Sequence, residues 1–350
     1  MDVAELTQAM AAASRSGIAP HGVAPPSHSA STARHFGRWT LEPPCHKVRP
    51  PISPLSVEGP SNASAHWIAA QAAGRACIQV RLPCYPCLEE RGNPMRPLKA
   101  KVAIVTGAGS GIGRATARLF AEQGASVVAV DWNKEAGAET AEWIGRDGYE
   151  ARFQHTDVSR APEVERMVHF AVEQYGGLDV LFSNAAVQIL GTVTETSEEE
   201  WDRIHSVNLK GVFLCSKYAI PEMIRGGGGS VINMASVLGL VGDPDLAANC
   251  AAKGGVIALT KATAMGYGPK GVRVNCICPG DVDTPMVQDY FSKDPNPERA
   301  RQTVSSHYAL RRIADPREVA QTAAFLASDA SSFMTGSVVV VDGGLTSKCY

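Results

Sequence analysis

From Lys99 onward the chain alternates between short apolar runs and longer segments in which apolar residues recur at helical spacing. The first apolar run, Val102–Thr106, is continuous and is followed by a glycine, which is typical of a parallel strand buried on both faces. In residues 112–124 the apolar positions fall close to one face of a helix: Ile112, Ala115, Leu119 and Phe120. The pattern therefore predicts a strand followed directly by a helix.

The same alternation continues to the end of the chain. Further strands are predicted at Ser126–Val130, Ala151–His155, Val180–Ser183, Ser230–Met234, Val272–Ile277 and Ser337–Val341. Helices are predicted over Lys134–Gly145, Ala161–Tyr175, about Glu198 to Met223, Leu246–Tyr267 and Pro316–Ser328, with a loop at Gly226–Gly229. Seven strands separated by helices predict an α/β protein with one doubly wound, seven-stranded parallel sheet, a Rossmann fold.

The first 94 residues differ in composition from the rest. They hold 12 of the 22 prolines and 5 of the 9 histidines. Such a segment cannot bury enough apolar surface to offset chain entropy, so residues 1–94 are predicted to be a low-complexity, disordered extension. Three interpretations stay open: a targeting segment, an interaction tail, or non-native residues before a natural start at Met95. We favour the third, because residues 95–350 have the length of one complete α/β domain.

Composition narrows the class of protein. The chain has 350 residues, a net charge of −2 and 45% hydrophobic residues. It therefore lacks the excess of positive charge that is typical of proteins that bind nucleic acids. No apolar run is long enough to predict a membrane-spanning helix. Nine cysteines in this length do not indicate a disulfide scaffold and favour a reduced, cytoplasmic setting. Cys276 and Cys278 are expected to be core thiols, and neither the Cys84–Cys87 pair nor any other group predicts a metal site.

A glycine-rich turn joins the first predicted strand to the first helix. It contains Gly107, Ser110, Gly111, Ile112 and Gly113. Glycines there let a pyrophosphate approach the backbone at a helix N-terminus, where N–H groups and the helix dipole favour anions. Asp131 ends the next strand, where a carboxylate binds adenosine ribose hydroxyls and repels a 2′-phosphate. The sequence therefore predicts an NAD site and disfavours NADP.

A second polar group lies downstream. Ser236 follows a predicted strand, Lys253 lies in a predicted helix, and Asn208 lies in the long helix before both. Together with the glycine turn, this arrangement resembles the short-chain dehydrogenase/reductase family, whose active site combines Ser with Tyr-x-x-x-Lys. The resemblance runs from Lys99 to Gly344.

The resemblance implies further cofactor contacts. Asp157 and Val158 follow the third strand and would hold the adenine. The remaining positions lie after the fourth and sixth strands, near the nicotinamide: Asn184, Ala185, Pro279, Gly280 and Thr284, with Lys253 contacting the cofactor as well.

The resemblance also implies the catalytic roles. Ser236 would position the substrate oxygen, Lys253 would lower the pKa of the proton-transferring tyrosine, and Asn208 would link a relay water to the lysine. The tyrosine position itself holds Asn249. A carboxamide forms hydrogen bonds but does not titrate near neutral pH, and loss of a general acid/base costs about 10²–10⁴ in rate.

Two functions remain open. The first is an NAD-dependent oxidoreductase that interconverts a secondary alcohol and a ketone, impaired by Asn249. The alternative is an inactive NAD(H)-binding sensor or oligomeric scaffold. The family resemblance suggests a homo-oligomer, a tetramer or dimer. We expect the substrate pocket to be apolar, with contributions from Leu238, Leu240, Val241, Met286 and Val287, and to be closed by a lid over Asp281–Pro297.

Overall fold

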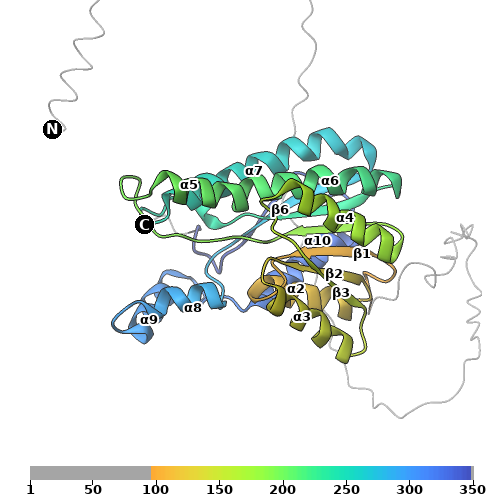
Figure 1. The fold of residues 1–350 in the computed structure, drawn as a ribbon. Coiled ribbons are helices and arrows are strands. Elements are labelled where there is room, and N and C mark those ends of the chain that lie inside the picture. Colours follow the sequence, from red (N-terminus) through yellow and green to blue (C-terminus); the bar gives the residue numbers. More distant parts are fainter. Residues whose placement is uncertain (1–95, 348–350) are drawn as a thin grey trace, which may run out of the picture. The chain divides into compact units, whose positions relative to one another are not determined.

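The computed structural model describes residues 96–347, so the predictions for residues 1–94 and for Cys84 and Cys87 lie outside the described residues. The described chain forms one seven-stranded sheet with the order β3-β2-β1-β4-β5-β6-β7, and all neighbouring strands run parallel (Figure 1). The strands are β1 Val102–Thr106, β2 Ser126–Asp131, β3 Ala151–His155, β4 Val180–Ser183, β5 Gly229–Met234, β6 Val272–Pro279 and β7 Val338–Val341. The predicted Rossmann fold is confirmed.

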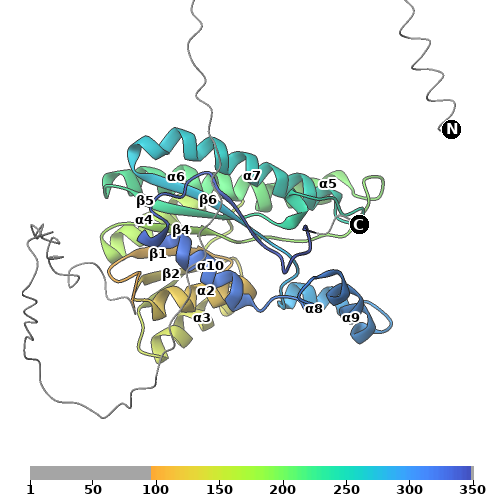
Figure 2. The ribbon, with the colours of Figure 1, turned by 180° about the vertical axis from the view of Figure 1, so that it is seen from behind.

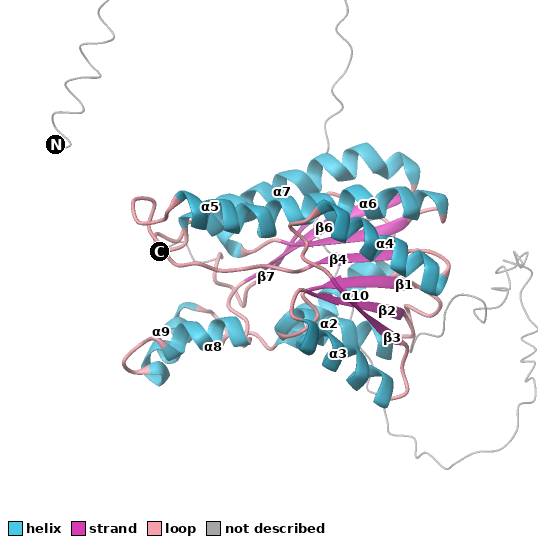
Figure 3. Ribbon diagram, viewed as in Figure 1, coloured by secondary structure: helices cyan, strands magenta, loops and turns pink. Residues whose placement is uncertain are grey.

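Helices cover both faces of the sheet, as the layers in Figure 3 show. One layer contains α2 Gly111–Glu122, α3 Lys134–Arg146 and α10 Pro316–Ala327 (Figure 2). The other contains α4 Ala161–Tyr175, α5 Glu198–His205, α6 Gly211–Arg225 and α7 Ala247–Tyr267. The central strands β1, β2 and β4 are buried on both sides, so their sequences are almost continuously apolar, whereas the edge strand β3 has no buried residue.

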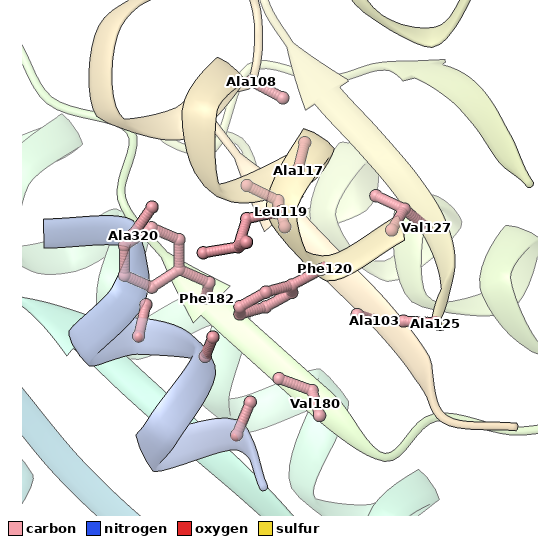
Figure 4. Packing of buried hydrophobic residues seen from close by; sticks show 14 of the residues in the cluster. Ala103, Ala108, Ala117, Leu119, Phe120, Ala125, Val127, Val180, Phe182 and Ala320 are labelled. Carbon is pink, nitrogen blue, oxygen red and sulfur yellow. The ribbon is translucent and has the colours of Figure 1, made fainter. Parts of the chain in front are cut away.

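The core under α2 and α10 shows why the glycine turn is rigidly supported. Phe120 of α2 packs on Phe182 of β4, with ring centroids 6.4 Å apart and planes tilted by 51° (Figure 4). Both rings are fully buried, and the α10 side of the cluster is built from alanines such as Ala320. Small residues on α10 let it lie close to α2, which fixes the N-terminus of α2 against the sheet.

The long helix predicted before Gly226 is not uniform. Between α5 and α6 the chain forms a π-helical turn, Ser206–Lys210, and Asn208 lies within it. Such turns insert one residue per turn and are frequent at functional sites. The predicted loop also ends one residue early, because Gly229 already pairs with Val272 of β6.

The segment predicted as a lid has more secondary structure than its sequence indicates. It contains α8, Pro285–Ser292, and is followed by α9, Pro297–His307, which was not predicted. The two helices lie to one side of the sheet layers (Figure 1). Their apolar stripe is weak, since Phe291 is the only buried residue of α8 and α9 has none. Helical periodicity therefore gave little signal here.

Candidate active site

The turn between β1 and α2 is shaped for close backbone approach. Gly107 and Gly111 have φ values of +66° and +50°, the left-handed region that favours glycine. A Cβ on Gly107 would lie 2.9 Å from the Ala185 Cα, and a Cβ on Gly113 would overlap the Gly107 carbonyl. Ser110 precedes α2, and its side chain does not cap the helix. The first N–H groups of the helix are therefore not occupied by that side chain and could bind an anion.

Asp131 lies at the end of β2 with its carboxylate fixed. One oxygen accepts a hydrogen bond from the Gly109 N–H at 2.8 Å, and the other accepts one from the Asn133 N–H at 2.8 Å. Each oxygen keeps acceptor capacity toward the cavity. Lys134 is exposed to solvent, as predicted, and does not neutralise this carboxylate.

Trp132 was missed by the sequence analysis. Its side chain keeps 69% of its surface exposed and lines the cavity directly after Asp131. The signal available in the sequence was its place one residue after the acidic position.

Asp157 and Val158 face the same end of the cavity from the loop after β3. Burial alone would raise the pKa of Asp157, but hydrogen bonds from the Ser159 hydroxyl and N–H outweigh it and lower the pKa. Val158 is buried against Gly211, whose missing side chain leaves it room. The loop is thus held in one conformation with Asp157 ionised near neutral pH.

Asn184 and Ala185 connect the ends of β1 and β4, where the strand order reverses. Their N–H groups donate to the Thr106 hydroxyl at 2.9 and 3.1 Å, and the Asn184 amide donates to the Thr106 carbonyl at 2.9 Å. In parallel α/β sheets, ligands bind outside the carboxyl ends of the strands at this switch point.

Pro279 ends β6, Gly280 follows it, and Thr284 caps α8. The methyl group of Thr284 lies 2.9 Å from where a Cβ on Gly111 would be. The segment after β6 therefore touches the glycine turn directly, although the two are far apart in sequence.

Asn208 and Asn249 bind the same carbonyl group. Asn208, fully buried, accepts from the Val187 N–H and donates to the Val187 carbonyl, both at 2.8 Å. Asn249, 4% exposed, donates from Nδ2 to the same carbonyl at 3.1 Å. Because that carbonyl can only accept, the orientation of the Asn249 amide is fixed, and its Oδ1 has no hydrogen-bond partner within residues 96–347.

Ser236 and Lys253 complete the group. The Ser236 oxygen accepts from the Leu238 N–H at 3.1 Å, which leaves the hydroxyl hydrogen available to a ligand. The Lys253 ammonium donates to the Met234 carbonyl at 2.7 Å. Burial lowers the pKa of Lys253 to about 8, against a smaller opposing effect of Cys278.

One cavity of about 1120 Å³ joins these groups. Every predicted site residue lines it except Gly113, which lies behind the turn and contacts Gly107 and Asn184. Cys276 and Cys278 are fully buried core thiols, as predicted. His205 stacks on Trp201 at a centroid distance of 4.1 Å and does not line the cavity.

The pocket prediction needs one correction and one addition. Leu238, Val241, Met286 and Val287 line the cavity, but Leu240 does not and is 44% exposed, because the 3₁₀ turn at Val237–Gly239 directs it outward. The added residues come mostly from α8, α9 and the chain after it: Tyr290, Phe291, Val304, His307 and Tyr308.

Among residues 96–347, no cluster of His, Cys, Asp or Glu is arranged to hold a metal ion. Within the same range no helix combines the length and hydropathy needed to cross a membrane.

Comparisons with known proteins identify the family. A family model described as enoyl-(acyl carrier protein) reductase matches residues 107–346. The chain belongs to the short-chain dehydrogenase/reductase family of oxidoreductases. Its members generally use a nicotinamide dinucleotide, and the glycine cradle and the fixed carboxylate of Asp131 fit such a group.

Individual relatives include alcohol and diol dehydrogenases. The chain is 44% identical over 248 residues to meso-2,3-butanediol dehydrogenase of Serratia marcescens, covering 71% of this chain and 95% of that protein. It is 43% identical over 251 residues to cyclohexanol dehydrogenase of an Acinetobacter strain, covering 71% and 96%. The crystal structure of levodione reductase superposes with a TM-score of 0.70 at 34% identity, covering 72% of this chain and 99% of that one.

Proposed function

We propose that this protein is an NAD-dependent oxidoreductase of secondary alcohols and ketones whose turnover is impaired at Asn249. The main observation that supports this proposal is that one cavity is lined by the glycine turn, Asp131, Asn208, Ser236 and Lys253. The apolar lining from Leu238, Val241 and Met286, together with relatives named for butanediol and cyclohexanol, favours a small or cyclic secondary alcohol.

NAD is proposed rather than NADP because of Asp131. Its two oxygens are oriented by the N–H groups of Gly109 and Asn133, so the carboxylate is held at the end of β2, where it would bind the ribose hydroxyls of NAD. A phosphate there would face a carboxylate at close range with Lys134 pointing to solvent.

The proposed roles of the residues follow from their hydrogen bonds. A bound nicotinamide ring supplies the hydride acceptor for alcohol oxidation. The Ser236 hydroxyl donates to the substrate oxygen and orients it. Asn208 fixes the backbone at Val187, which forms the wall beside the substrate. Lys253, with its lowered pKa, binds cofactor hydroxyls and exchanges protons through water.

Asn249 is proposed to be the weak point of the site because it occupies the family's tyrosine position. A phenol would reach past the backbone to the substrate oxygen, whereas the Asn249 amide is hydrogen-bonded to the Val187 carbonyl. Its Oδ1 cannot take up and release a proton near neutral pH. The hydroxyl proton must then leave by a slower route, which reduces turnover without weakening cofactor binding.

A second candidate is an NAD(H)-binding sensor or scaffold without turnover. The specific observation in its favour is that the Asn249 Nδ2 donates to the Val187 carbonyl of the protein itself. We further propose a homo-oligomer and a cytoplasmic setting. We also propose a functional domain spanning residues 95–350, in line with relatives matched over 95% and 96% of their length.

The deciding experiment measures NAD⁺ reduction by a panel of secondary alcohols with the wild-type chain and Asn249→Tyr. We expect about 10²–10⁴-fold faster turnover for Asn249→Tyr, with NADH affinity changed less than about threefold. Cys250→Ser, one residue away, is the matched control and should leave both values unchanged. Equal rates in wild type and Asn249→Tyr would show that another group transfers the proton. NADH binding without turnover in either would favour the sensor.

A further inference from the structure

The lid helices α8 and α9 are attached to the rest of the molecule by few buried contacts. They form a small core around Phe291, Tyr308 and Ile313 that is separate from the clusters under the sheet. α8 and α9 together form one wall of the substrate end of the cavity. Because this apolar core is small, we expect polar contacts to contribute to holding this wall in place.

Asp283 supplies that attachment. Its two carboxylate oxygens accept from both terminal nitrogens of Arg301 in α9, at 3.2 and 2.6 Å, a bidentate pair. The Gln288 amide of α8 donates to the same carboxylate at 3.2 Å. The pair with Arg301 and the bond from Gln288 lower the pKa of Asp283, so the carboxylate is ionised at neutral pH. A single side chain thus binds both lid helices.

The backbone of Asp283 is also held by a residue outside the two lid helices. Its N–H donates to the Ala314 carbonyl at 2.8 Å, and the preceding Val282 is 3% exposed. The carboxylate therefore projects from a rigid backbone toward the lid rather than moving with it.

The next residue carries the connection to the cofactor site. Thr284 accepts from the Val287 N–H at 3.4 Å and so begins α8, while its methyl group packs against Gly111 of the glycine turn. Any displacement of α8 would move Thr284 relative to the turn. Thr284 therefore contacts both α8 and the glycine turn.

A second attachment lies at the far end of α9. The Tyr308 hydroxyl donates to the Asp281 carboxylate at 2.6 Å and accepts from the Asp281 N–H at 2.7 Å. The Tyr308 ring also lies 2.8 Å from where a Cβ on Gly280 would be. This bond fixes the C-terminal end of α9, but α8 and the start of α9 depend on Asp283.

We propose that Asp283 is a positioning residue that holds α8 and α9 over the cavity and keeps Thr284 against the glycine turn. The inference rests on the proposed nicotinamide cofactor function. Loss of the carboxylate should loosen the lid and weaken cofactor binding together, because Thr284 belongs to both.

The test compares Asp283→Asn with Asp289→Asn. Asp289 of α8 pairs at 2.7 Å with Lys293, the residue that follows the helix, and both are well exposed, so its variant removes an ion pair that does not join α8 to α9. For Asp283→Asn we expect NADH affinity, followed by fluorescence, to fall about fivefold. Tryptic cleavage after Arg299, which takes part in neither ion pair, should accelerate to a similar degree, with the melting temperature little changed.

Two further variants separate positioning from general destabilisation. Asp283→Glu should restore most of both readouts, and Arg301→Met combined with Asp283→Asn should be no worse than Asp283→Asn alone. The proposal is overturned if Asp283→Asn matches Asp289→Asn in cleavage rate and in NADH affinity. A wild-type chain that binds no NADH would overturn the proposed function and the coupling, while the cleavage rates would still report whether the carboxylate holds the lid.

Discussion

The two ends of the cavity differ in how completely their polar groups are satisfied. At the end formed by β1, β2 and α2, the Asp131 carboxylate is held by two backbone N–H groups. The glycine positions of the turn leave no room for a Cβ atom. At the other end, Asn249 donates to the protein backbone and leaves its Oδ1 without a partner within the described chain.

The difference indicates that binding and chemistry can be lost separately. In the function proposed above, cofactor binding depends on backbone geometry away from position 249, whereas proton transfer depends on the side chain at that position. The proposal therefore predicts a complete nucleotide site combined with slow turnover.

The sharpest test of this separation uses Ser236 in the restored enzyme. In an Asn249→Tyr background, Ser236→Ala should reduce turnover about 10²–10⁴-fold, because the substrate oxygen loses its orienting donor, while NADH binding is retained. Stopped-flow rates and NADH fluorescence measure the two effects. Ser206→Ala, which removes an exposed hydroxyl bonded to the Arg203 carbonyl, is the control. A parallel loss of NADH affinity in Ser236→Ala would mean that the two ends are not independent.

A smaller effect is expected at the nucleotide end. Asp131→Ser should shift the ratio of NADH to NADPH affinity toward NADPH by about 10–100-fold, since the repelling carboxylate is gone. Fluorescence titration with both cofactors measures the ratio, and Trp132 beside the site provides a nearby reporter. Glu135→Gln, an exposed acid in the first turn of α3, should leave the ratio unchanged. An unchanged ratio in Asp131→Ser would contradict the proposed NAD preference.

The smallest effect concerns Lys253 and pH. Its folded pKa of about 8 lies below the value near 10.4 of an unfolded lysine. Between these values the unfolded chain binds the extra proton, so the free energy of unfolding should rise with pH from about 8 to about 10. Relative to Lys253→Met, wild type should gain on the order of 1–2 kcal/mol over this range. Urea unfolding at several pH values measures the difference. Parallel curves for the two proteins would show that the Lys253 pKa is not lowered.

Much of the fold could be predicted because its signals are local. Continuous apolar runs such as Val102–Thr106 mark strands buried on both faces, and the glycine turn marks the junction with α2. The helices α8 and α9 could not be predicted in the same way. They bury almost nothing along their own length and are held by Asp283 and Tyr308, through contacts that sequence periodicity does not record.

By itself, the sequence predicted the order of the strands and of most helices, the nucleotide turn and Asp131, because periodicity and turn signals specify these along the chain. The roles of Asn208, Ser236, Asn249 and Lys253 were predicted from the resemblance to the family. Only the tertiary structure decided that Asn249 and Asn208 meet at the Val187 carbonyl, 62 and 21 residues away in sequence. The same holds for Trp132 at the cavity wall and Asp283 on Arg301. Such contacts depend on how the carboxyl ends of the strands converge, and a hydrogen-bond partner is chosen by distance and direction rather than by sequence spacing.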